Sequence, residues 1–144
     1  MRKFILALIA LVFSMSVFAH GPTPQKVQES ITVNIPPAKA WSVVKNFTDF
    51  NKIMKTRSFD DEIMKIKYEM LKKDGPFSDY NAYIIVKKGA NDNESVIQWT
   101  ARFYRIYKLN PPIPEGQDDA TAKAAVKKIV ESGLANLKKS LASK

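Results

Sequence analysis

The chain has 144 residues, of which 45% are hydrophobic, with 23 basic and 14 acidic side chains and a formal charge of +9. This apolar fraction excludes a largely disordered protein, and the length fits one ordinary domain with a packed core. The chain contains no cysteine, which excludes disulfide bonds, thiol nucleophiles and thiolate metal sites.

The first segment, residues 1–19, has the pattern of a secretory signal peptide. Arg2 and Lys3 precede an apolar run, and small residues lead up to Ala19. The apolar run is shorter than the roughly 20 residues that span a bilayer, although an uncleaved membrane anchor is the alternative. We predict cleavage after Ala19, which leaves a periplasmic domain of residues 20–144 and lowers the formal charge from +9 to +7.

The next part of the chain predicts a strand followed by a helix. Apolar and polar residues alternate from Ile31 to Ile35, as in a strand with one buried face. Pro36 and Pro37 end this strand and suit the first turn of a helix. The apolar side of this helix is expected to consist of Ala40, Trp41, Val44 and Phe47. A second short helical or turn segment is predicted from Asp49 to Met54.

Three further strands are predicted from residues that alternate with period two. Their buried sides are expected to consist of Met64, Ile66, Tyr68 and Met70, then Ala82, Ile84 and Val86, then Ile97, Trp99, Ala101 and Phe103. The segments 60–62, 74–76 and 89–93 are rich in acidic residues, glycine, proline and asparagine, which is typical of turns. Short turns of this kind indicate antiparallel neighbours.

The last stretch predicts a long amphipathic helix from Asp118 to Leu141. Apolar residues recur at steps of three and four, and most lysines fall on the other side. Asp118 and Asp119 supply a cap and negative charge at the positive end of the helix dipole. Gly133 costs about 1 kcal/mol relative to alanine inside a helix, so we expect the backbone of a sheet to approach there. The whole pattern indicates an α+β domain.

Several segments resemble the START-like (SRPBCC) superfamily, whose architecture is called the helix-grip fold. They are Asn34–Trp41 (NIPPAKAW), Phe59–Met70 (FDDEIMKIKYEM), Trp99–Tyr104 (WTARFY) and the loop that leads into Asp118. The resemblance implies a curved antiparallel sheet wrapped around the long C-terminal helix, with an apolar cavity between them. Residues 20–27 (HGPTPQKV) and 114–119 (PEGQDD) further resemble the MxaD-type periplasmic members, which are associated with methanol oxidation.

The chain departs from this superfamily in one place. In members of the superfamily, about two more strands separate the segments that match Phe50–Met54 and Phe59–Met70. In this chain, only Lys55–Ser58 lies between them. We therefore predict a shortened helix-grip sheet of about four strands instead of six or seven. A smaller sheet leaves a cavity that is open, collapsed or completed by a second copy of the chain.

Aromatic side chains are the candidates for a ligand-binding cavity, because such cavities are mostly apolar with a few polar anchors. The candidate cavity residues are Trp41, Tyr68, Trp99 and Phe103, with Phe47 considered beside them. Tyr68 and Trp99 are the best of these, since each carries a polar group that needs a partner when buried. The alternative interpretation is that all of them belong to the core.

Lysines accompany the strands and the last helix. The candidate partner-binding residues are Lys65, Lys67, Lys87, Lys127 and Lys128. Such charges can steer a protein towards an acidic partner surface, or they can simply be solvated. A nucleic-acid partner is disfavoured, because no recognition motif is present and the protein is expected to be exported.

The sequence offers no catalytic set. His20 is the only histidine, and no Gly-rich phosphate loop or nucleophile elbow is present. We therefore expect a non-enzyme with no catalytic residues, no cofactor and no metal site. The MxaD resemblance implies an accessory protein that promotes contact between methanol dehydrogenase and its cytochrome c acceptor. The alternatives are a carrier of a small hydrophobic ligand and a degenerate copy without activity; the oligomeric state stays open, with a dimer as one possibility.

Overall fold

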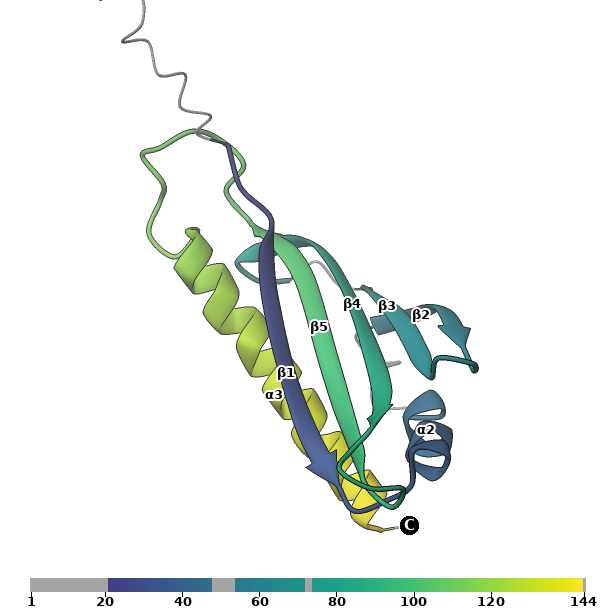
Figure 1. Cartoon of the computed structure of the whole chain (residues 1–144). Helices are drawn as coiled ribbons and strands as arrows, with labels where there is room; N and C mark the ends of the chain where they lie inside the picture. Colours follow the sequence, from purple (N-terminus) through teal and green to yellow (C-terminus); the bar gives the residue numbers. More distant parts are fainter. Residues whose placement is uncertain (1–20, 48–53, 72–73, 144) are drawn as a thin grey trace, which may run out of the picture.

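The computed structural model describes residues 21–47, 54–71 and 74–143. Within these ranges, an antiparallel sheet carries two helices on one of its faces (Figure 1). The strands are β1 (Gln25–Val33), β2 (Met54–Asp60), β3 (Lys65–Met70), β4 (Phe77–Lys88) and β5 (Ser95–Arg105). The helices are α2 (Pro37–Lys45) and α3 (Asp119–Ala142). The predicted α+β class and the long C-terminal helix are confirmed. The predicted signal peptide, His20 and most of the predicted segment 49–54 lie outside the described residues.

The sheet order is β1-β5-β4-β3-β2, and every neighbouring pair is antiparallel. The first strand of the chain therefore pairs with the last, and α3 runs along both of them (Figure 1). We call the face that contacts the helices the inner face; it carries buried residues such as Ile66, Ile84 and Trp99. The opposite, outer face carries polar residues such as Lys67 and Arg102.

The sheet has five strands among the described residues, so the prediction of about four was one too low. The missed strand is β2, and the predicted connection Lys55–Ser58 lies inside it. Strand β2 is at the edge of the sheet, and Met54 is its one buried residue. Because the rest of β2 is polar or exposed, it has no apolar alternation that could reveal a strand. A bulge between Thr56 and Ser58 interrupts the pattern further.

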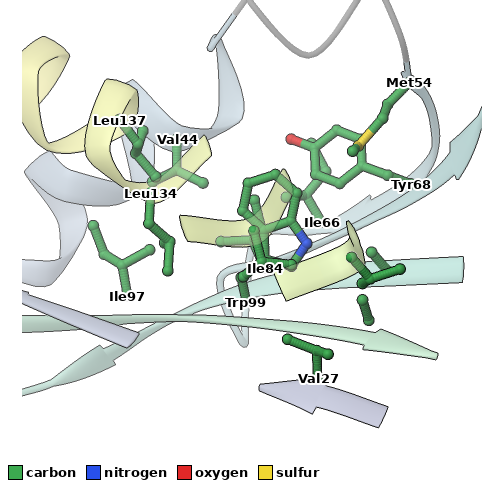
Figure 2. Packing of buried hydrophobic residues seen from close by; sticks show 14 of the residues in the cluster. Val27, Val44, Met54, Ile66, Tyr68, Ile84, Ile97, Trp99, Leu134 and Leu137 are labelled. Atoms are coloured by element: carbon green, nitrogen blue, oxygen red, sulfur yellow. The ribbon is translucent and has the colours of Figure 1, made fainter. Parts of the chain in front are cut away.

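The inner face and the two helices enclose the core. Figure 2 shows the side chains of Ile97 and Trp99 rising from the sheet towards Leu134 on α3. The buried residues of α3 are Ala122, Val126, Val130, Leu134, Leu137 and Leu141, which recur at the predicted helical spacing. The predicted cap is also present, because an Asp118 side-chain oxygen accepts a hydrogen bond of 3.0 Å from the backbone N–H of Thr121.

The turn between β2 and β3 is tied to α2. Trp41 and Lys45 each donate a hydrogen bond of 2.8 Å to Asp61 Oδ1. The lysine bond is also an ion pair. Together these contacts lower the pKa of the Asp61 carboxyl, with the Lys45 bond as the larger cause and the Trp41 bond as the smaller one. The predicted acidic turn therefore holds α2 against the edge hairpin.

Candidate functional site: an apolar cavity beside the long helix

A cavity of about 460 Å³ lies between α3, the inner face of the sheet and the chain just after α2. Its apolar lining consists of Phe47, Met54, Pro76, Phe77, Trp99, Ala125 and Ile129. Its polar lining consists of Asp74, Lys128, Ser132 and Asn136. A volume of several hundred Å³ with mostly apolar walls and a few polar groups is typical of a small-molecule site.

Helix α3 presents a second stripe to this cavity, next to the stripe that enters the core. Ala125, Ile129, Ser132 and Asn136 follow one another at steps of three and four residues, which places them on one side of the helix. Lys128 adds an ammonium group to the same side. Helix α3 therefore carries two adjacent stripes: an apolar stripe that packs in the core and a mixed apolar and polar stripe that lines the cavity.

Trp99 forms the wall between the core and the cavity. Its side chain is 1% exposed, and it packs directly against Gly133 of α3. A β-carbon on Gly133 would lie 2.6 Å from Cη2 of the indole, which is too close for any side chain. The prediction of a close approach at Gly133 is therefore confirmed, but a side chain of the sheet makes this approach, and not a backbone. The reason is that the large indole fills the space where a β-carbon would stand.

A bulge in β4 shapes the part of the cavity wall that Phe77 forms. The pairing with β5 shifts between Ser78 and Asn81, and Asp79 within this shift has a φ of +53°. The extra residue lets Phe77 and Tyr80, which are three residues apart, both face the core. Phe77 then lines the cavity, and burial raises the pKa of Tyr80, an effect that the Trp99 side chain partly offsets.

The loop before β4 closes one end of the cavity. Gly75 has a φ of +136°, a conformation that side chains rarely allow. A β-carbon there would also lie 2.9 Å from Cε1 of the Phe77 ring. Glycine at this position therefore lets the loop lie against Phe77 and form part of the cavity lining.

Of the four predicted cavity residues, Trp41, Tyr68, Trp99 and Phe103, only Trp99 lines this cavity. Phe47, considered beside them, lines it as well. Trp41 instead binds Asp61 through its indole N–H, and Phe103 packs edge-on against Phe77 with ring centroids 6.4 Å apart. Tyr68 is 2% exposed, and burial raises the pKa of its hydroxyl. Ligand binding by any of these residues stays a prediction.

Several lining residues had no signal that the sequence interpretation used. Met54 and Phe77 reach the cavity from two different strands, and period-two alternation does not extend to Phe77 because of the bulge. The stripe that includes Ala125 and Ser132 was visible as a helical repeat of small and polar residues. That repeat could have indicated a side of the helix at the border between the core and open water.

The predicted partner-binding lysines lie on two separate surfaces. Lys65, Lys67 and Lys87 are on the outer face of the sheet, where Lys65 Nζ lies 4.1 Å from the centre of the Tyr83 ring and Lys87 donates to Gln98 Oε1 at 3.1 Å. Lys127 and Lys128 are on α3. Lys127 forms an ion pair of 3.8 Å with Glu131, while Lys128 stands at the cavity. Partner binding by these lysines stays a prediction.

The described part of the chain contains no cluster of three or more histidine, cysteine, aspartate or glutamate side chains that could hold a metal ion. In the same part, no helix has the length and apolar character needed to cross a membrane.

Comparisons with known proteins agree with the fold. A protein-family model described as "Polyketide cyclase / dehydrase and lipid transport" matches residues 53–142. Among curated proteins, none matches the sequence.

Three solved structures illustrate the likeness in fold. An uncharacterised protein from Bacillus thuringiensis has 17% identity and a TM-score of 0.65, covering 81% of this chain and 98% of its own. Protein XoxI from Bacillus cereus has 16% identity and a TM-score of 0.63, with 81% and 94% covered. The Zhui aromatase/cyclase from Streptomyces sp. R1128 has 12% identity and a TM-score of 0.57, with 84% and 93% covered. At these identities the likeness shows the fold alone, and the helix-grip architecture implied by the sequence is confirmed.

Proposed function

Since this chain belongs to the polyketide cyclase / dehydrase and lipid transport family, we propose that it binds and carries a small hydrophobic molecule in the cavity beside α3. The observation that supports this most is the cavity of about 460 Å³ with mostly apolar walls. The mixed stripe of α3 would orient the ligand, with Lys128 and Asn136 available for a polar end. No catalytic step is part of this proposal.

The expected affinity follows from the hydrophobic effect. A ligand that buries roughly 300 Å² of apolar surface gains about 7 kcal/mol, at about 25 cal/mol per Å². The loss of translational and rotational freedom offsets a large part of this gain. We therefore expect dissociation constants in the micromolar range or weaker, and binding assays should cover that range.

The direct test uses a neutral apolar probe and a variant that fills the cavity. N-phenyl-1-naphthylamine becomes fluorescent in an apolar site and carries no charge that the lysines would attract. Ala125 lines the cavity, so Ala125→Phe should weaken probe binding about tenfold or more, because the ring occupies the ligand volume. Ala135 is exposed on the same helix and does not line the cavity, so Ala135→Phe is the matched control and should bind the probe as the wild type does.

Two outcomes would contradict the carrier function. The first is a wild-type protein that shows no saturable binding. The second is equal binding by Ala125→Phe and Ala135→Phe, which would place the probe elsewhere. Tryptophan fluorescence adds a local readout: the chain has two tryptophans, so Trp41→Phe leaves only Trp99, whose emission should change as the cavity fills.

The carrier is proposed to act in the periplasm after cleavage behind Ala19. The support is the signal-peptide pattern of residues 1–19. Sequencing the N-terminus of the protein recovered from the periplasmic fraction should give His20 as the first residue. Recovery of Met1 from the membrane fraction would instead favour the uncleaved anchor.

A second candidate is the accessory role, in which the protein promotes contact between methanol dehydrogenase and cytochrome c. The observation that favours it is the gathering of Lys65, Lys67 and Lys87 on the outer face, which suits an acidic protein partner. Co-sedimentation with both purified proteins should appear at low salt and fade at moderate salt, since exposed charges are screened. No association at low salt would exclude this role, while a dimer of the chain alone would point to self-assembly.

A further inference from the structure

The outer face of the sheet holds a small cleft, which is separate from the apolar cavity on the inner face. Its volume is about 120 Å³, and it is lined from three sides by Arg57 on β2, Lys67 on β3 and Arg102 on β5. Lys67 pairs with Tyr83, and Tyr83 pairs with Thr100 across adjacent strands. Arg102 pairs with Asn81, which also accepts a hydrogen bond from Arg57. Three cationic side chains from three strands therefore line one cleft, and the rest of its lining consists of Tyr68, Asn81, Ala82, Tyr83 and Thr100.

The positive charge of the cleft is barely compensated. Among the described residues, the carboxylate that pairs with a cleft cation is that of Glu69, whose Oε2 lies 3.8 Å from Arg57 Nε in a half-exposed pair. Among the described residues, no carboxylate lies within ion-pair distance of Lys67 or Arg102. Arg57 also donates a hydrogen bond of 3.1 Å to Asn81 Oδ1, which holds its guanidinium over the cleft.

Tyr83 lines the same cleft, and its phenol lies close enough to several cations for their charges to act on it. Interaction with the Thr100 hydroxyl is the main cause that lowers the pKa of the Tyr83 phenol; burial opposes it, and the charges of Lys65, Lys26 and Arg102 add to it. An environment that favours a phenolate also favours other bound anions. The Thr100 side chain is fully buried beneath the cleft.

We propose that this cleft binds a phosphate-type oxyanion, either free in solution or as the headgroup of a lipid. Guanidinium groups donate paired hydrogen bonds that match a tetrahedral oxyanion, and a lysine ammonium adds a point charge. The cleft, with a volume of about 120 Å³, is small and suits a single group of this kind. The inference does not rest on the apolar cavity, so either proposal can fail alone.

The test titrates the purified protein with inorganic phosphate and follows the backbone amides of Tyr83 and Thr100 by NMR. We expect saturable shifts, and the exposed-residue variants Arg102→Gln and Lys67→Gln should weaken binding about tenfold or more, because each removes one charge-assisted hydrogen bond. Lys87→Gln removes a charge from the same face outside the cleft and should change the affinity by less than about twofold.

A second experiment with lipid vesicles distinguishes free phosphate from a lipid headgroup as the source of the oxyanion. Saturable phosphate binding without binding to phosphatidylglycerol vesicles would assign a soluble phosphate. Vesicle binding that is lost in Arg102→Gln and kept in Lys87→Gln would assign a headgroup, with phosphatidylcholine vesicles as the uncharged reference. The proposal is overturned if neither ligand binds, or if Arg102→Gln and Lys87→Gln lose binding equally, since that result means dispersed charge and no site.

Discussion

Replacing Gly133 by alanine tests the contact between α3 and the Trp99 wall of the cavity. The added β-carbon would lie 2.6 Å from indole Cη2 and closer still to Cζ3. Carbon atoms in contact normally lie about 3.5–4.0 Å apart. Because the indole is 1% exposed, it has to move by about an ångström, either against packed neighbours or into the cavity.

The expected magnitude follows from two opposed effects. Overpacking a buried site costs about 1–3 kcal/mol, and overlap with two carbons of a rigid ring places the cost near the upper end. Alanine regains about 1 kcal/mol of helix propensity over glycine. We therefore expect Gly133→Ala to lower the free energy of unfolding by about 2 kcal/mol, and the melting temperature by about 6–10 °C for a domain of this size. Binding of the apolar probe should weaken as well, because the displaced indole narrows the cavity.

Denaturant and thermal unfolding of a double-mutant cycle provide the assay. Trp99→Phe removes the ring carbons that would clash, so the two changes together should cost less than the sum of the single costs by at least about 1 kcal/mol. The reasoning is refuted if Gly133→Ala stabilises the protein by the helix-propensity gain alone. It is also refuted if the cycle is additive within about 0.5 kcal/mol.

Two further predictions concern polar contacts that hold elements together. The folded protein lowers the pKa of Asp61 through Lys45 and Trp41, so the stability that this carboxylate contributes is present at neutral pH and is lost as the pH falls through the folded-state pKa. The melting temperature of the wild type should therefore drop more than that of Asp61→Asn between about pH 5 and about pH 2.5, and parallel curves would contradict this. Arg105 is 5% exposed, donates to the carbonyl oxygens of Tyr107 at 2.8 Å and Leu109 at 3.2 Å, and reaches the start of α3 through an ion pair with Asp119. Arg105→Met should cost about 2–3 kcal/mol and speed hydrogen–deuterium exchange in the loop 106–117, where unchanged exchange would show that the arginine does not hold the loop.

The sequence predicted those elements whose residues alternate between two environments. Strands β3 and β5, β4 from Tyr80 onwards and helix α3 each have a continuous apolar side, and the period of that side is enough to assign the element. Strand β2 was missed because an edge strand with one buried residue, Met54, owes its place to hydrogen bonds with β3 and hardly at all to burial. Backbone pairing of this kind leaves no trace in the order of polar and apolar side chains.

The cavity was predicted less completely than the fold, for a physical reason. Periodicity tells which side of a strand or helix is buried, but not whether a buried ring meets another side chain or an empty space. Trp41, Tyr68 and Trp99 look alike in this respect, yet only Trp99 of the three lines the cavity. Its place depends on Gly133, far along the chain, which leaves room for the indole against α3.

The bulge at Asp79 connects the irregular features of the sheet with the cavity. In a regular strand, residues three apart lie on opposite faces, so Phe77 and Tyr80 could not both be buried. The extra residue at Asp79 brings both to the inner face, and aspartate is among the few residues besides glycine that adopt a φ of +53° at modest cost. Phe77 then lines the cavity together with Trp99 of the neighbouring strand, while Tyr80 interacts with Trp99. The bulge residue Asp79 thus helps to shape the apolar site on the inner face, because it changes which side chains of β4 face inwards.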